Sequence, residues 1–250
     1  MKSIFIVGYW NSGTTLLVDL LRKHPEVKLK RARYKPNLEE RDIVKILKKL
    51  DSNFIELGDY SEVIENGFKN YNEPIFAGEK KEKFNKEFLK KFKVKENKYL
   101  LLKNPWLFFM PNFIKNQFSD FEMKKIIILR HGHSQVVSKD YWLRNTDKPE
   151  LKLFARAKFW VRAMEYFFEN WHNKPDTLVL RYESVCENPH KLVRQICDFI
   201  NIKFEPIEKK VPDKLENKLG KWNQLPDDLK KEIDIIIKPI QEKLDSAYPI

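Results

Sequence analysis

The sequence predicts an α/β fold: one three-layer domain in which helices flank a central parallel sheet of about four to five strands. Short apolar runs that end in turn signals occur at residues 4–7, 99–102, 125–129 and 177–180. Longer stretches with helical periodicity separate them, and this alternation is typical of βαβ units. The 250 residues fit one large domain better than two small ones, so we expect residues 1–250 to form a single domain.

Helical periodicity is found in residues 14–24, 37–50, 105–117, 134–143, 149–171, 189–200 and 226–244. Four of these stretches begin with a proline, which suits the first turn of a helix. Residues 51–97 have weak periodicity and scattered Gly, Asn and Lys. We interpret that region as an insertion or a lid.

The charge balance favours an anionic partner. Lys and Arg number 48 against 36 Asp and Glu, a net charge of +12. This charge suits a nucleotide, an acidic glycan, nucleic acid or a lipid headgroup. An abundance of lysine on exposed faces explains the same number, so charge alone does not choose among these partners.

The number of cysteines and the length of the apolar runs indicate in which cellular compartment the protein is expected. Cys186 and Cys197 are the two cysteines, and they indicate neither a disulfide framework nor a Cys-based metal site. The first apolar run is too short for a signal peptide, and no run approaches the roughly eighteen apolar residues of a membrane span. We expect a cytoplasmic protein without a membrane span, or a catalytic region of a longer chain.

Charged residues directly follow three of the predicted strands: Lys103, Arg130 and Arg181. The carboxyl ends of parallel strands meet at one edge of the sheet, where ligands of open α/β folds bind. We therefore expect the ligand to bind at this edge of the sheet, near these three charged residues.

Residues 8–15 read GYWNSGTT and stand between the first predicted strand and the first predicted helix. In this context the Gly-x4-Gly-Thr-Thr pattern predicts a phosphate loop of the P-loop NTPase-like kind, because backbone N–H groups and the helix N-terminus converge on one small volume. A nucleoside triphosphatase or ordinary kinase needs a lysine at the position of Thr14. Its absence counts against those enzymes.

A second phosphate-binding feature follows the third predicted strand. Arg130 stands at the strand end and Ser138 eight residues later, in LRHGHSQVVSKDYW. A guanidinium can hold a phosphate bidentately, and a hydroxyl from the next helix can complete the contact. The alternative is an Arg that caps the sheet edge and a Ser that faces solvent. His131 and His133 lack supporting ligands nearby in the sequence, so we expect no metal.

Residues 12–27, SGTTLLVDLLRKHPEV, closely resemble the 5′-phosphosulfate loop and following helix of sulfotransferases that use 3′-phosphoadenosine-5′-phosphosulfate (PAPS). In that family the Arg and Ser of the second feature hold the 3′-phosphate of PAPS, which implies these roles for Arg130 and Ser138. The loop contacts that the resemblance implies come from Ser12, Gly13, Thr14 and Thr15.

Three more segments resemble the family, in family order. YLLLKNPWLF resembles a strand whose final lysine, here Lys103, reaches the sulfuryl group; the alternative is a lysine that extends to water. LVLRYESVCENPHKL resembles a segment in which Tyr182 lines the nucleotide site. KLGKWNQLP resembles the segment that folds over the nucleotide, through Lys218, Lys221 and Trp222.

Asn11 is the main departure from the family pattern. Most members carry Arg or Lys immediately before Ser-Gly-Thr, where the cation stabilises charge on the leaving phosphate, whereas an amide brings no charge. Relatives often place a glutamate, as the general base, some twenty residues after the Ser-Gly-Thr-Thr loop. The base is not assigned here; the nearest carboxylates to that position are Glu39, Glu40 and the more remote Glu79.

Together these features imply a sulfotransferase that moves the sulfuryl group of PAPS to a hydroxyl or amine, such as that of a carbohydrate or peptide, without a metal. The product would be adenosine 3′,5′-bisphosphate (PAP), with Lys103 and Asn11 at the reaction centre. The alternatives are a non-catalytic protein that binds PAP or an anionic polymer, and a P-loop nucleotide kinase. We expect no nucleic acid partner, and the sequence leaves the acceptor and the oligomeric state open.

Overall fold

The computed structural model describes residues 2–29, 42–51, 63–65, 73–92, 98–138, 149–216 and 218–250. They contain a five-stranded sheet with the order β2-β3-β1-β4-β5. Every pair of neighbouring strands is parallel. The strands are β1 (Lys2–Val7), β2 (Val27–Leu29), β3 (Tyr99–Lys103), β4 (Glu122–Leu129) and β5 (Thr177–Arg181). The predicted α/β fold with a parallel sheet is confirmed.

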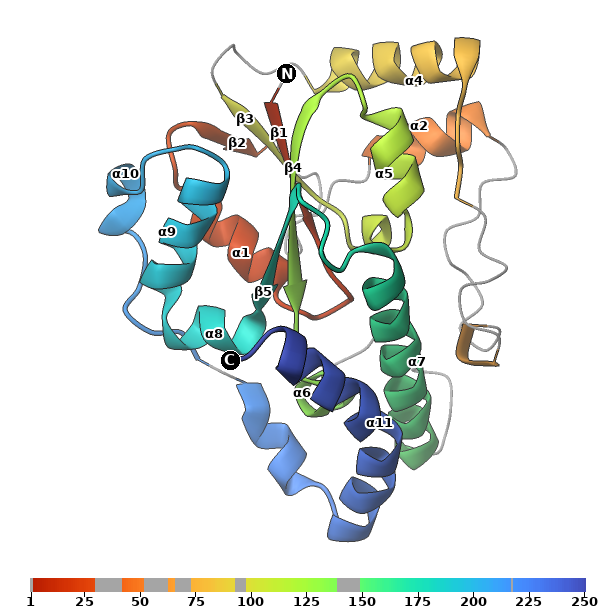
Figure 1. Ribbon diagram of the computed structural model, residues 1–250, viewed down its shortest axis with the longest axis vertical. Coiled ribbons are helices and arrows are strands. Elements are labelled where there is room, and N and C mark those ends of the chain that lie inside the picture. Colours follow the sequence, from red (N-terminus) through yellow and green to blue (C-terminus); the bar gives the residue numbers. More distant parts are fainter. Residues whose placement is uncertain are drawn as a thin grey trace.

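Helices flank this sheet on both faces (Figure 1). Before β4 lie α1 (Thr14–Leu21), α2 (Asp42–Leu50), α4 (Gly78–Lys91), the 3₁₀ helix η1 (Pro105–Phe109) and α5 (Pro111–Gln117). After β4 lie α6 (Gly132–Val136), α7 (Pro149–Asn170), α8 (Tyr182–Glu187), α9 (Pro189–Phe199), α10 (Glu205–Glu208), the 3₁₀ helix η2 (Lys218–Gln224) and α11 (Asp227–Ala247).

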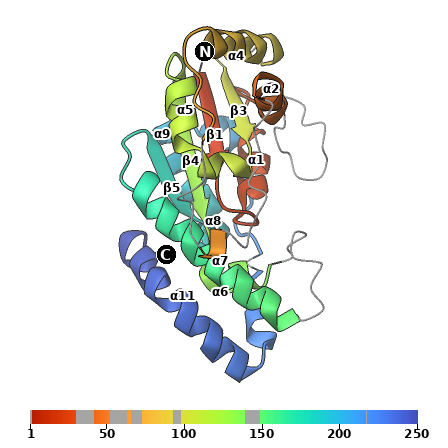
Figure 2. The same cartoon turned by 90° about the vertical axis from the view of Figure 1, so that its right-hand side faces the viewer.

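Alternation along β1 builds two cores, one on each face of the sheet. Ile4 and Ile6 pack with side chains of α1, α8 and α9, whereas Phe5 and Val7 pack with side chains of α2, α4, α5, α7 and α11. Figures 1 and 2 show these two groups of helices on opposite sides of the sheet. Each large apolar side chain that is fully buried contributes about 1.5–3 kcal/mol to stability, so both layers help to hold the sheet together.

The strand order puts the phosphate loop at the switch point of the sheet, because the chain leaves β1 toward β2 on one side and leaves the neighbouring β4 toward β5 on the other. β1 lies between β3 and β4, with Ile6 beside Lys103 and Val7 beside Ile127. The loop that follows β1 is therefore flanked by the carboxyl ends of both neighbours, and ligands of open α/β sheets bind at such a point. In Figure 1 the strands run downward, so α6 and α11 lie beyond this edge and α4 lies at the opposite end.

Part of the region 51–97 is helical and packed on the domain. Phe84 and Phe88 of α4 are fully buried in the core, while residues 52–62, 66–72 and 93–97 lie outside the described part of the chain. The interpretation of this region as an insertion or lid stays a prediction. None of the described helices is long and apolar enough to cross a membrane.

Candidate active site

The loop between β1 and α1 has two residues in the left-handed backbone region. Asn11 has φ 61° and Gly13 has φ 104°. Asparagine is one of the few side chains that adopt this conformation readily, and glycine adopts it without strain. A Cβ atom at Gly13 would also lie only 2.4 Å from a ring carbon of Tyr182. The GYWNSGTT pattern thus has a backbone reason as well as a chemical one.

The carbonyl groups of this loop are held by partners in the protein. Tyr9 O accepts from Ser12 N at 3.1 Å, and Trp10 O accepts from Nε2 of Gln135. Asn11 O accepts from a guanidinium nitrogen of Arg130 at 3.0 Å. Because the carbonyls have these partners, the loop adds little negative potential to the start of α1.

The N-terminus of α1 has no side-chain cap, because its N-cap residue is Gly13. The first turn of a helix leaves backbone N–H groups without helical partners, and its dipole favours an anion. Ser12 lies beside them; its buried hydroxyl has no hydrogen-bond partner among the described residues. Thr14 is buried and Thr15 is half-buried. This arrangement suits a phosphate or phosphosulfate group.

Lys103 supplies a positive charge on the β3 side of the loop. The side chain is 2% exposed, and its Nζ donates to Thr15 Oγ1 at 3.1 Å. The alternative of a strand-end lysine that extends to water is wrong, since the ammonium group turns inward to the first turn of α1.

Arg130 supplies a positive charge on the β4 side. Its guanidinium carbon lies 4.6 Å from the ring centre of Tyr182, and its buried Nε has no hydrogen-bond partner among the described residues. Burial raises the pKa of Tyr182 to about 12, with a further contribution from Cys186. The phenol is therefore neutral at physiological pH, and it gives Arg130 an aromatic face to stack on.

Ser138 lies just past the end of α6. Its hydroxyl donates to Gln135 O at 2.7 Å, and its carbonyl accepts from Arg156 at 3.0 Å. The structure places Ser138 on the segment that Arg130 begins, with its hydroxyl turned back onto α6. A phosphate contact would require that hydroxyl to rotate.

The segment predicted to cover the nucleotide forms η2, which packs against α6. The Trp222 ring stacks on His133 with centroids 4.0 Å apart and an interplanar angle of 16°. Lys221 is exposed, and the side chain of Lys218 lies outside the described part of the structure. Trp222 therefore lies against α6, on a residue three positions after Arg130 in the chain.

Neither His131 nor Glu79 adds a positive charge or a metal ligand to the site. Burial, together with the neighbouring His133, lowers the pKa of His131 to about 4, so it adds no positive charge near neutral pH. Glu79 is exposed on α4 and pairs with Lys83 at 2.6 Å, while Glu39 and Glu40 lie outside the described residues. In the described ranges no cluster of three or more His, Cys, Asp or Glu is arranged to hold a metal ion.

Gln135 is a site residue that the sequence did not reveal. It is 4% exposed and donates to the loop carbonyl of Trp10, which lies 125 residues earlier in the chain. A glutamine in a short helix has no distinctive pattern, and its partner is defined only by the packing of α6 against the loop.

Among the solved structures that resemble the chain are three described as sulfotransferases. They are a sulfotransferase from Alicyclobacillus acidocaldarius (16% identity over 98% of this chain and 95% of that one, TM-score 0.57), mouse sulfotransferase SULT7A1 complexed with PAP (16%, 98% and 86%, 0.57) and the sulfotransferase domain from the curacin biosynthetic pathway (16%, 100% and 98%, 0.54). At this identity the likeness shows the fold. No curated protein matches the sequence.

The family comparison covers most of the chain. A model described as the sulfotransferase family matches residues 3–206, from β1 into α10. This range contains the phosphate loop and both buried cations of the site. The chain therefore belongs to the sulfotransferase family, whose reaction is sulfuryl transfer.

Proposed function

We propose that this protein transfers the sulfuryl group of PAPS to a hydroxyl or amine of an acceptor and releases PAP. The observation that carries the proposal is the pair of buried cations, Lys103 and Arg130, on opposite sides of a phosphate loop whose carbonyls are held by other partners. The structurally similar mouse sulfotransferase is complexed with PAP, which supports the choice of donor.

The described residues fit such a nucleotide. The 5′-phosphosulfate would lie at the uncapped start of α1, beside the hydroxyl of Ser12, which has no partner in the part of the chain that the structure describes. The 3′-phosphate would be held by Arg130, whose buried Nε has no hydrogen-bond partner within the described ranges, and by Ser138. Tyr182, stacked under the guanidinium, would line the nucleotide, and η2 would cover it through Lys218, Lys221 and Trp222.

The residues of the site would act by positioning and electrostatics. Lys103 lies at the first turn of α1, where its charge would stabilise negative charge that develops during in-line transfer. The amide of Asn11 would take the place of the cation that most family members carry there. A carboxylate or histidine would deprotonate the acceptor; Glu39 and Glu40 remain candidates.

Ligand-induced thermal stabilisation tests the donor assignment. We expect PAP to stabilise the protein more than adenosine 5′-monophosphate (AMP), which differs from PAP only in lacking the 3′-phosphate. At a concentration of 100 times the dissociation constant, stabilisation should be about 2.7 kcal/mol. An equal response to PAP and to ATP with Mg²⁺ would contradict a 3′-phosphate site.

Transfer itself is tested with labelled PAPS and a panel of glycans, peptides and small hydroxyl or amine compounds. Label on at least one acceptor, together with formation of PAP, is the expected result. PAP binding without any transfer across a broad panel would instead favour a non-catalytic nucleotide-binding protein.

Asn11→Arg is expected to preserve or raise turnover, by up to about tenfold, because it restores a cation beside the leaving phosphate. The left-handed backbone at this position should cost the variant roughly 1 kcal/mol of stability. Turnover is measured as PAP formed at saturating PAPS, and stability by thermal unfolding. Asn11→Gly is the matched control, since it keeps the backbone and removes the amide. Loss of turnover in the Arg variant with unchanged PAP affinity would show that the amide has a role of its own.

A further inference from the structure

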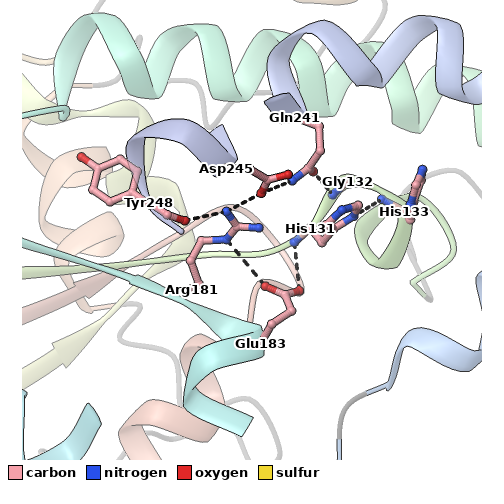
Figure 3. Close-up of polar contacts among 8 residues, drawn as sticks. All are labelled: His131, Gly132, His133, Arg181, Glu183, Gln241, Asp245 and Tyr248. Carbon is pink, nitrogen blue, oxygen red and sulfur yellow. Dashed lines mark hydrogen bonds and ion pairs between the residues drawn. The ribbon is translucent and has the colours of Figure 1, made fainter. Parts of the chain in front are cut away.

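The short helix α6 begins two residues after Arg130, and side chains from other segments hold the backbone amides of its N-cap residue and of its first residue. His131 N donates to Glu183 Oε1 at 3.0 Å, and Gly132 N donates to Gln241 Oε1 at 2.8 Å (Figure 3). Both amides are therefore bound within the protein. The 3′-phosphate would have to be held by side chains, whose direction depends on how α6 is placed.

A polar network joins these two contacts into a closed loop; its side chains are buried at Arg181, Glu183 and Gln241, and that of Asp245 is 45% exposed. Asp245 Oδ1 accepts from Gln241 Nε2 at 2.7 Å and from Arg181 at 2.8 Å, and Arg181 also donates to Tyr248 O at 3.0 Å. The Nε of Arg181 lies 3.7 Å from Glu183 Oε2. Figure 3 shows this path running from the start of α6 through α11 to the end of β5 and back. The contacts of the buried members favour one fixed arrangement, because losing one of them leaves a desolvated polar group on Arg181, Glu183 or Gln241.

Two more features attach α6 to α11. His133 Nε2 lies 2.5 Å from Oδ1 of Asp234, which is in the first half of α11. A Cβ atom at Gly132 would come within 3.1 Å of Trp160 on α7 and 3.2 Å of Ile237 on α11, so the helix start fits closely between them. A helix of five residues is not stable on its own. The direction of α6 is thus set by these tertiary contacts.

We propose that α11 is a working part of the nucleotide site, in which Gln241 and Asp245 are positioning residues that direct Arg130 toward the 3′-phosphate. The inference rests on the proposed use of PAPS. α11 lies beyond residues 3–206, which match the family, so this role is not carried over from the match. The residues act through the backbone of α6 and touch no reacting atom.

Gln241→Met tests this role, because methionine keeps the length of the side chain and removes both polar contacts. We expect the dissociation constant of PAP to rise about tenfold, whereas that of AMP should stay within about twofold, since misplaced groups cost binding only where they make contact. Both constants are measured by calorimetric titration. The control is Glu242→Gln, which removes an exposed carboxylate from the next position of α11, where it pairs only loosely with Lys238 at 3.8 Å.

A second pair of variants covers the case in which Gln241→Met does not fold. Asp245→Asn keeps the Oδ1 acceptor and should retain the preference for PAP over AMP, whereas Asp245→Ala should lose most of it. Wild-type protein that binds PAP no more tightly than AMP would overturn the proposed 3′-phosphate site and this inference together. A wild-type preference for PAP that survives both Gln241→Met and Asp245→Ala, or parallel losses of PAP and AMP, would overturn the inference alone.

Discussion

Lys103→Met is expected to lower the rate of PAP formation from PAPS by about 10²–10³-fold, with a much smaller loss of PAP affinity. The lysine is 2% exposed and its Nζ touches Thr15 Oγ1, so its charge acts in a poorly solvated place at the start of α1. Electrostatic stabilisation is strongest in such surroundings. Methionine fills nearly the same volume and removes the charge.

The matched control is Lys98→Met, which removes a half-buried lysine directly before the amino end of the same strand, where its Nζ donates to Pro25 O at 3.3 Å. Single-turnover rates at saturating PAPS separate the chemical step from binding. Equal rates for wild-type protein and Lys103→Met would contradict the role of Lys103 in transfer, and a loss confined to PAP affinity would reduce it to a binding residue.

Arg130→Ala is expected to weaken PAP binding by about 100-fold and AMP binding by less than about threefold, because charge-assisted hydrogen bonds to a phosphate are worth about 1.5–3 kcal/mol each. The substitution also frees the Asn11 carbonyl and uncovers the ring of Tyr182. We therefore expect the free energy of unfolding to fall by about 1 kcal/mol.

The ratio of the dissociation constants of PAP and AMP separates the loss of the 3′-phosphate contact from any general loss of order in the loop, which would weaken both ligands. Arg194→Ala is the control, since Arg194 is an exposed arginine of α9 that pairs with Glu208 at 3.3 Å. Similar losses for PAP and AMP in Arg130→Ala would refute the assignment of the 3′-phosphate to this guanidinium.

The elements that the sequence predicted are those with a strong local pattern. Four of the strands were predicted within a few residues, and α7 and α9 each end one residue before the predicted end. β2 was missed because three residues are too short to show alternation, and it exists through its pairing with β3. α6 begins two residues before the predicted start, because the side chain of His131 accepts from His133 N and so forms the N-cap. The second half of that predicted helix lies outside the described residues.

The site also has a part that a local pattern predicts and a part that depends on contacts between distant segments. The loop residues were predictable because a strand, two glycines and a helix start stand together in a few positions of the chain. Trp222 was expected in the segment that folds over the nucleotide, and the structure stacks it on His133, a contact between residues 89 apart that no local pattern encodes.

By itself, the sequence determined the parallel α/β architecture, the phosphate loop and the charged residues at the strand ends. These features follow from hydrophobic period and turn chemistry, which neighbouring residues carry. Only the tertiary structure decided which of those charges meet the loop. Lys103 and Thr15 are 88 residues apart, Arg130 and Asn11 are 119 apart, and Gly132 and Gln241 are 109 apart. They meet because β1 lies between β3 and β4 and because α11 packs beside α6 and α7, and both arrangements result from burial of two apolar layers over the whole domain.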